Sequence, residues 1–195
     1  MTEPLAIIFD CDGTLVDSMP PHYEAWAATL AKFNLKLDED RFYALGGWPT
    51  EKVAELLIGE AQLTLDPRQI TREKEAAFEQ FIHLVEPIAP VIAVARQHHG
   101  RIPLAVATGG LRRICERLLK QASILELFDA VVTCEDVARH KPAPDVFLEA
   151  ARRIGVDPAD CLVFEDTNPG IEAAERAGMR WIDVRTLHTP RRVVA

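Results

Sequence analysis

The sequence predicts an α/β protein: a parallel sheet covered by helices, with a helical module inserted after the first strand. Two observations carry this prediction. Apolar runs alternate with helical patterns in the C-terminal half, and the segment from about Pro20 to Pro87 has helical periodicity with little strand-like pattern. Alternating elements of this kind form parallel sheets through right-handed crossovers. We expect a core formed by residues 1–16 and 88–195 and an inserted helical cap formed by residues 17–87.

The first strand is expected over Leu5–Phe9, because its apolar residues do not alternate with polar ones, as in a strand that helices cover on both faces. In the inserted segment, apolar residues recur at helical spacing, for example at Tyr23, Trp26 and Leu30. Trp26 and Phe78 are expected in the core of this module.

After Pro87 and Pro90 the pattern becomes strand and helix in turn. The expected strands are Pro103–Ala107, Ala130–Thr133, Cys161–Phe164 and Trp181–Val184. The expected helices are Leu111–Gln121, Asp145–Ile154 and Ile171–Ala177. Gly178 follows the last helix at the position where glycine commonly ends one.

Composition excludes several classes of protein. The net charge of −8 and the pI near 5.3 argue against a nucleic-acid groove and against a polybasic membrane surface. No apolar run approaches membrane-spanning length, and Met1–Pro4 lacks the basic start of a signal peptide. The four cysteines are far apart and form no CxxC pair. We therefore expect a reduced, cytoplasmic protein with no nucleic-acid or membrane partner.

Two carboxylates, Asp10 and Asp12, follow the first strand. Side chains two residues apart on an extended backbone point the same way, and Gly13 allows a tight turn. One carboxylate can attack a substrate, and the other can donate and accept a proton. The alternative is a simple turn at a strand end, where Asp and Gly are common.

Glu165 and Asp166 follow the strand at Cys161–Phe164. In an open parallel sheet, ligands bind at the carboxyl ends of the strands, and adjacent carboxylates there suit Mg²⁺. The alternative is that these acids complement the dipole of the next helix.

Two further segments follow strands. Thr108-Gly109-Gly110 precedes an expected helix, so its N–H groups could bind an anion, although Thr108 could also be an ordinary helix cap. Lys141 lies between His140 and Pro142 and could neutralise a phosphate or a carboxylate, although a loop lysine is usually solvated.

The order and spacing of four motifs resemble those of the haloacid dehalogenase-like hydrolase superfamily. These motifs are Asp10–Ser18, Thr108, Lys141 and Glu165–Asp166. The resemblance covers nearly the whole chain, and the helical insert resembles the small cap of the β-phosphoglucomutase-like branch. It implies a Rossmann-like parallel sheet core with an inserted small α-helical cap.

The resemblance also implies roles for the core residues. Asp10 would attack phosphorus to form an aspartyl-phosphate, and Asp12 would act as general acid and then general base. Thr108, Gly109 and Lys141 would bind the transferring phosphoryl group. The implied Mg²⁺ ligands are Asp10, the backbone carbonyl of Asp12, Asp166, and Glu165 directly or through water.

In the cap, His22, Thr50 and Lys74 are the expected substrate residues. His22 and Lys74 resemble cap residues of the mutase, whereas Thr50 stands where the mutase has an arginine that grips a second phosphate. Three short segments of the cap resemble bacterial phosphatases of the fructose-1-phosphate and 6-phosphogluconate type. They are Pro49-Thr50, Arg72–Lys74 and Val85–Pro87.

We therefore expect a monomeric, Mg²⁺-dependent phosphatase of small sugar phosphates of these two types, with an aspartyl-phosphate intermediate. One alternative is a β-phosphoglucomutase, which shares the catalytic core. Another is a non-catalytic regulatory domain on the same fold, although such a relative should have lost one of Asp10, Asp12, Lys141 or Asp166.

Overall fold

The computed structural model describes residues 3–193, so residues 1–2 and 194–195 of the predicted core lie outside the described part. Its residues form two compact units. Residues 3–17 and 86–189 form what we call the sheet unit, and residues 18–85 and 190–193 form the helical unit. The division differs slightly from the predicted boundaries, because Asp17 and Glu86–Pro87 belong to the sheet unit and residues 190–193 to the helical unit.

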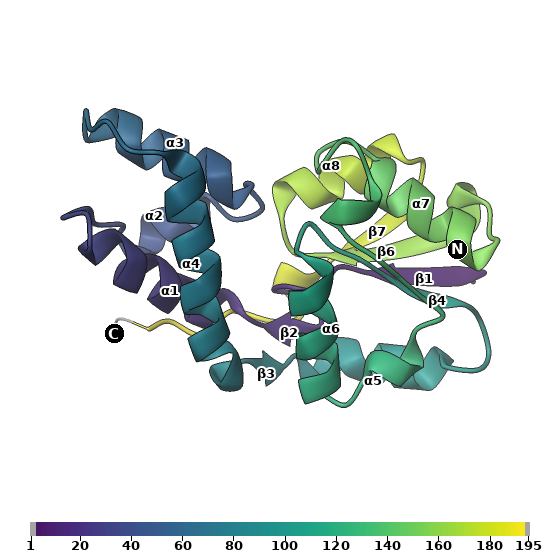
Figure 1. Cartoon of the computed structure of the whole chain (residues 1–195). Helices are drawn as coiled ribbons and strands as arrows, with labels where there is room; N and C mark the ends of the chain where they lie inside the picture. The colour runs from purple at the N-terminus through teal and green to yellow at the C-terminus, as the bar shows by residue number, and fades with distance from the viewer. Residues whose placement is uncertain (1–2, 194–195) are drawn as a thin grey trace. The chain divides into compact units, whose positions relative to one another are not determined.

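The sheet unit contains a five-stranded parallel sheet in the order β5-β4-β1-β6-β7 (Figure 1). Its strands are β1 (Ala6–Phe9), β4 (Leu104–Ala107), β5 (Ala130–Val132), β6 (Cys161–Glu165) and β7 (Arg180–Asp183). Each begins and ends within one residue of the predicted strand, and the α/β class is confirmed. Because β1 is central, with Phe9 opposite both Val106 and Phe164, three strand ends lie beside one another.

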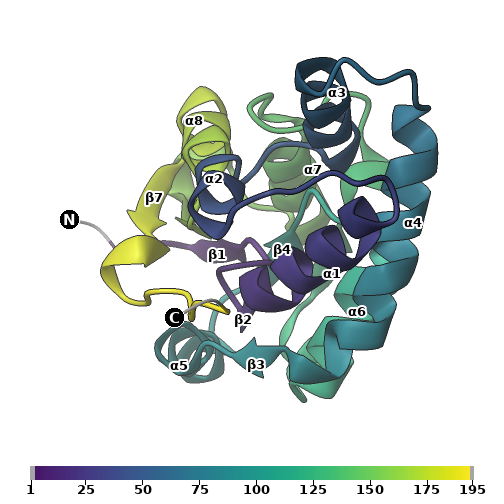
Figure 2. The same cartoon turned by 90° about the vertical axis from the view of Figure 1, so that its left-hand side faces the viewer.

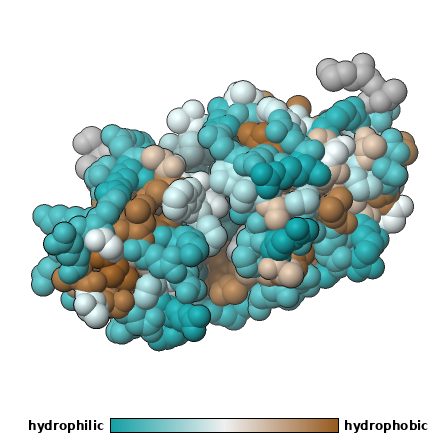
Figure 3. Space-filling model, turned by 90° about the horizontal axis from the view of Figure 1, so that it is seen from above, coloured by the Kyte–Doolittle hydropathy of each residue, from teal (hydrophilic) through white to brown (hydrophobic). Residues whose placement is uncertain are grey.

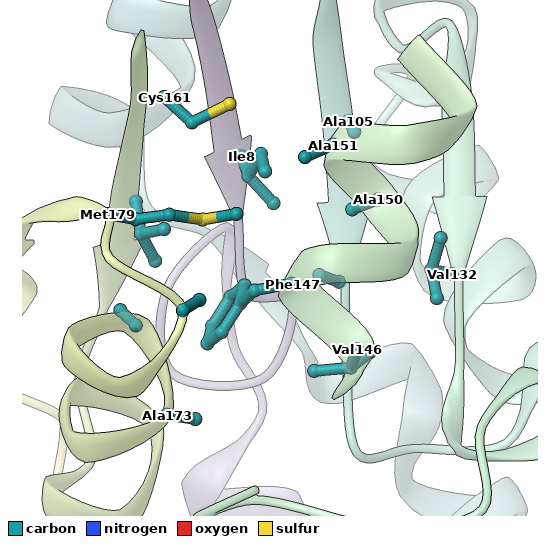
Figure 4. Close-up of a cluster of buried hydrophobic side chains, with 14 of the residues drawn as sticks. Ile8, Ala105, Val132, Val146, Phe147, Ala150, Ala151, Cys161, Ala173 and Met179 are labelled. Atoms are coloured by element: carbon teal, nitrogen blue, oxygen red, sulfur yellow. The ribbon is translucent and has the colours of Figure 1, made fainter. Parts of the chain in front are cut away.

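Helices cover both faces of this sheet. They are α5 (Ala89–His98), α6 (Arg112–Gln121), α7 (Asp145–Ile154) and α8 (Asn168–Arg176). Figures 1 and 2 show α7 and α8 on one face, with α5 and α6 on the other. On the α7 and α8 face, alanines of strands and helices allow close approach, and Phe147 and Met179 fill the remaining space (Figure 4).

Two helices differ from the prediction, and each has a proline in its first turn. Helix α5 was not predicted, because Pro90 was interpreted as a break, whereas it occupies the first turn, where a missing N–H costs nothing. Helix α8 was predicted to begin at Ile171, but it begins three residues earlier, at Asn168. Pro169 lies in its first turn, where proline is again tolerated. At its other end, Gly178 adopts φ +74°, as the predicted helix end requires.

A short antiparallel ribbon joins the two ends of the inserted segment. Strand β2 (Val16–Asp17) pairs with β3 (Glu86–Pro87). The chain therefore leaves the sheet unit and returns to it through two paired strands.

The helical unit contains α1 (Met19–Ala31), α2 (Glu39–Ala44), α3 (Thr50–Glu60) and α4 (Pro67–Phe81). Its apolar core is centred on Trp26, Leu30 and Leu57. The expected burial of Trp26 and Phe78 is confirmed, with exposed fractions of 4% and 0%.

Figure 3 shows hydrophilic side chains over much of one face, with apolar groups between them. Within residues 3–193, no helix has the length and apolar character that a membrane crossing demands.

Candidate active site

Asp10 lies directly after the central strand β1. Its N–H donates to the carbonyl oxygen of Phe164 on β6 at 3.0 Å, which extends the sheet pairing by one residue and fixes the backbone. The residue is 6% exposed. Its Oδ1 accepts a hydrogen bond from Lys141 Nζ at 2.6 Å, so the carboxylate is held by an ammonium group from the loop before α7.

Lys141 is the centre of the site. Its Nζ also donates to Glu165 Oε1 at 2.9 Å and to the carbonyl oxygen of Ala107 at 3.2 Å, and it lies 4.8 Å from the ring centre of Phe147. Burial lowers the pKa of this lysine, but the charges of Asp10 and Glu165 outweigh it and hold the pKa above its ordinary value. The side chain is therefore a permanent cation that joins the ends of three strands.

The two acids at the end of β6 are each held by a threonine. The N–H of Thr167 donates to Glu165 Oε2, while Thr14 Oγ1 donates to Asp166 Oδ1 at 2.9 Å. Thr167 also accepts from the N–H of Gly170 and so caps α8. One carboxylate therefore faces Lys141, and the other is tied to the loop after β1.

Two glycines make room for these carboxylates. A methyl group on Gly13 would lie 2.2 Å from Asp166 Oδ2, and one on Gly170 would lie 1.8 Å from Glu165 Oε1. Gly13 also has φ +82°, a conformation that side chains disfavour. No other residue type fits either position without moving the acid beside it.

Three carboxylates share a small volume. Asp10, Glu165 and Asp166 each offer one oxygen, and these atoms lie within 4.8 Å of one another. Burial raises the pKa of Asp10 to about 7, with Glu165 adding repulsion against the opposing effect of Lys141, and burial with repulsion from Glu165 and Asp10 also raises the pKa of Asp166. One ammonium does not balance three carboxylates. The all-oxygen donor set and the excess negative charge fit Mg²⁺.

The loop after β4 brings a hydroxyl group to the same edge of the sheet. The N–H of Thr108 donates to the carbonyl oxygen of Val132, and its buried Oγ1 accepts from the N–H of Gly110 at 3.0 Å. Since Oγ1 is the acceptor there, its own hydrogen can still be donated to an anion.

Helix α6 begins at Arg112, one residue after the expected start, so Thr108-Gly109-Gly110 lies directly before it, as expected. Leu111 is extended, so the N–H groups of Gly109 and Gly110 belong to the loop before the helix. Their binding of an anion remains a prediction. Asp12 lies beside this loop, because a methyl group on Gly110 would be 3.4 Å from Asp12 Oδ2. All four sequence motifs therefore meet in the sheet unit.

The helical unit holds a separate polar group, which we call the lysine cluster: His22, Thr50, Lys74 and Glu75. Lys74 Nζ lies 2.9 Å from His22 Nδ1 and 3.0 Å from Glu75 Oε1. Thr50 Oγ1 donates to the same Glu75 oxygen at 3.0 Å. The structure thus brings together the three expected substrate residues of this unit.

Sequence reasoning missed three residues that hold these groups: Thr14, Thr167 and Glu75. Thr167 follows Glu165 by two residues, which is the usual spacing of an N–H that returns to a strand-end carboxylate. Thr14 binds Asp166 from the distant loop after β1, so its spacing gave no signal of this contact. Glu75 gave no signal beyond its position next to Lys74.

Comparisons with known proteins agree with this geometry. Residues 7–184 match the family model described as haloacid dehalogenase-like hydrolase. The chain is 45% identical over 182 residues to fructose-1-phosphate phosphatase YqaB of Escherichia coli (strain K12), covering 93% of this chain and 96% of that protein. It is 29% identical to β-phosphoglucomutase of Bacillus subtilis (strain 168), covering 89% and 80%.

A solved structure supports the fold. The crystal structure of a putative phosphoglycolate phosphatase from Lactobacillus plantarum has a TM-score of 0.83 at 18% identity, covering 92% of this chain and 86% of that one. The chain belongs to the haloacid dehalogenase-like hydrolase family and is a phosphoric monoester hydrolase with a Rossmann-like sheet unit.

Proposed function

We propose that the protein is a Mg²⁺-dependent phosphatase of small sugar phosphates, of the fructose 1-phosphate or 6-phosphogluconate type, acting through an aspartyl-phosphate. The observation that carries the proposal is the three-way contact of Lys141 with Asp10 and Glu165 at the strand ends. The 45% identity to a fructose-1-phosphate phosphatase supports the substrate class.

In the first step, a carboxylate oxygen of Asp10 attacks phosphorus and the bond to the sugar oxygen breaks. Asp12 donates its proton to that leaving oxygen, so the sugar departs as a neutral alcohol. Lys141 holds Asp10 in place and opposes its protonation, and with the Thr108 hydroxyl and the Gly109 N–H it faces the charge that spreads over the phosphoryl oxygens.

In the second step, Asp12 accepts a proton from water. The water oxygen attacks phosphorus, and the bond to Asp10 breaks to release phosphate. The residues that would hold Mg²⁺ are Asp10, Asp166, the backbone carbonyl of Asp12, and Glu165 directly or through water. When bound, the ion offsets the negative charge of the carboxylates and the phosphoryl group.

The test is phosphate release by the purified full chain from a panel of sugar phosphates, with and without Mg²⁺. We expect release only with Mg²⁺, and a loss of more than about a thousand-fold in Asp10→Asn, because the covalent route needs the carboxylate. The matched control is Asp160→Asn, the same change at an exposed position of the sheet unit, which should keep full activity. Retained activity in Asp10→Asn would remove Asp10 as the nucleophile.

The same assay separates the mutase alternative. A mutase primed with a sugar bisphosphate converts β-glucose 1-phosphate to glucose 6-phosphate, whereas a phosphatase releases free phosphate and forms no isomer. Accumulation of glucose 6-phosphate without free phosphate contradicts the proposal. The monomeric state and the cytoplasmic location remain predictions from the sequence.

A further inference from the structure

The turn that follows β5 is bonded to the loop that carries Thr108. The N–H of Cys134 donates to the carbonyl oxygen of Gly110 at 3.3 Å, and Glu135 Oε2 accepts from the N–H of Arg112 at 2.7 Å. Gly110 in turn donates its own N–H to Thr108 Oγ1 at 3.0 Å. The position of the Thr108 hydroxyl therefore depends on this turn, which lies 25 residues further along the chain than the loop in the case of Arg112 and its partner.

Asp136 holds this turn, which spans Cys134–Asp136. Its Oδ2 accepts from the N–H and the hydroxyl group of Thr133, at 2.8 and 3.0 Å, and from the guanidinium of Arg112. Its Oδ1 accepts from Arg153 Nη2 at 2.8 Å. Burial raises its pKa, but the bonds from Arg153 and Thr133 and the charge of Arg112 outweigh burial and lower the pKa to about 2. The carboxylate is therefore ionised near neutral pH, with hydrogen bonds to both of its oxygens.

The strand that leads into this turn is supported by side chains instead of a second strand. In the described part of the chain, β5 is an edge strand with a neighbour on one side only. The carbonyl oxygen of Val131 accepts from Arg112 Nη2 on α6 at 3.3 Å and from Arg153 Nη1 on α7 at 3.1 Å. Asp136 binds the same two guanidinium groups. One carboxylate thus links two helices to the strand end that accepts the N–H of Thr108.

We propose that Asp136 is a positioning residue for phosphoryl transfer: through Arg112 and the turn it holds the loop in the place from which the Thr108 hydroxyl donates to the phosphoryl group. This inference rests on the phosphatase activity proposed above and adds a residue to it. The contacts of Asp136 with the loop run through other residues, so its effect on the reaction is indirect. A shift of about 1 Å in a group that contacts the substrate can lower the rate by up to about 10²-fold.

Glu149 on α7 is a matched carboxylate for comparison. It also accepts from Arg153, at 2.7 Å, and from Arg152 at 2.7 Å to each oxygen. Hydrogen bonds from these arginines lower its pKa to about 2 as well. The side chains of Glu149 and Asp136 are 20% and 18% exposed. The two carboxylates differ in their remaining partners, because Asp136 binds Arg112 at the start of α6, beside the loop, whereas Glu149 binds Arg152 within α7.

The test measures kcat with Mg²⁺ in a double-mutant cycle, on fructose 1-phosphate or, if the wild type hydrolyses it faster, 6-phosphogluconate. Thr108→Val removes the hydroxyl and should lower kcat about 10²-fold. Asp136→Ala removes the acceptor that holds the turn and should lower kcat about tenfold. In the Thr108→Val background the same change should cost about twofold or less, because no hydroxyl is left to position. The control Glu149→Ala should leave kcat unchanged in both backgrounds.

Glu135→Ala is the second variant and decides the matter if thermal melts show that Asp136→Ala does not fold. Glu135 is exposed, and its loss removes only the acceptor of the Arg112 N–H. We therefore expect a smaller loss in kcat, about threefold, which again disappears in the Thr108→Val background.

The outcomes separate this inference from the proposed function. If kcat does not change in Asp136→Ala and Glu135→Ala, or falls equally in Glu149→Ala, the inference alone is wrong. The same holds if Asp136→Ala lowers kcat by the same factor with and without the Thr108 hydroxyl. A wild type that releases no phosphate from either substrate overturns the proposed function, and a fully active Thr108→Val variant overturns the role of Thr108 in it. The inference fails with either result.

Discussion

Each unit of the molecule encloses one lysine side chain in a polar cluster, and the two lysines differ in the charge around them. Lys141 in the sheet unit is 8% exposed and binds two carboxylates, with a third close by. Lys74 in the helical unit is 4% exposed and contacts one carboxylate and one imidazole nitrogen. The first cluster has excess negative charge, whereas the second is balanced.

The carboxyl pKa values report this difference. The pKa of Asp10 is raised to about 7 although Lys141 lies 2.6 Å away, because burial and Glu165 outweigh that lysine. The pKa of Glu75 is lowered although it too is largely buried, because the charges of Lys74 and His22 and the hydrogen bonds from Lys74 and Thr50 outweigh burial. In the sheet unit, one lysine faces three carboxylates, so negative charge remains that a metal cation could offset. In the helical unit, one lysine faces one carboxylate, so no such excess remains.

The largest expected effect separates the two lysines directly. Lys141→Met leaves Asp10 and Glu165 buried without a cation, so we expect a loss of about 3–5 kcal/mol in the free energy of unfolding of the metal-free protein. The transferring phosphoryl group also loses a cation, so kcat should fall about 10²–10³-fold. Urea unfolding and steady-state kinetics measure the two effects.

Lys74→Met is the matched comparison. It leaves a single carboxylate that partly reaches water, so the loss of stability should be about 1–3 kcal/mol, and the kinetic change should be mainly in KM. Equal losses of stability and of kcat in the two variants would remove the distinction between the clusters.

The second prediction concerns pH and Mg²⁺. The carboxyl pKa values of Asp10 and Asp166 lie above their ordinary value in the folded protein. Between about pH 4 and 7 the unfolded chain loses the proton of Asp10 while the folded protein keeps it, so the metal-free protein loses stability as the pH rises. The raised pKa of Asp166 acts in the same direction. Asp136 and Glu149, whose pKa values are lowered to about 2, lose their stabilising effect only below this range.

The proposed Mg²⁺ ligands are ionised carboxylates, so Mg²⁺ should raise Tm more at pH 8 than at pH 5. At a hundred times its Kd the gain is about 2.7 kcal/mol. Thermal melts with Mg²⁺ or EDTA at both pH values measure it, and Asp166→Asn should remove most of the difference. An equal Mg²⁺ effect at both pH values would argue against carboxylates as its ligands.

The contrast between the units also explains what the sequence could predict. In the sheet unit, Asp10 and Glu165 directly follow apolar strands, and parallel topology brings such ends to one edge. The four motifs could therefore be joined before any coordinates. Helix α5 was missed because Pro90 is compatible with either a break or a first turn. The choice between them depends on burial of Val91 and Ile92, which is a tertiary property.

The lysine cluster could be predicted only in part, because helices bring residues together from unrelated positions. His22 and Lys74 were expected from a resemblance, but the partnership of Glu75 with Thr50 depends on how α3 packs against α4. Nothing in the spacing of these residues indicates that contact. Charge balance, which separates the two clusters, is thus visible only in the folded chain.

The smallest expected effect uses one glycine from each unit. Gly13→Ala places a methyl group 2.2 Å from Asp166 Oδ2 on a backbone with φ +82°, so it should cost about 1–2 kcal/mol for the backbone alone and weaken Mg²⁺ binding by displacing the acid. Gly59→Ala on α3 meets no atom within 4 Å and should gain about 0.5–1 kcal/mol, because alanine loses less backbone entropy in a helix. Urea unfolding in EDTA measures the stability of both variants, and Mg²⁺ titration measures their metal affinity. If Gly13→Ala binds Mg²⁺ as tightly as the wild type, Asp166 does not need the space that this glycine provides.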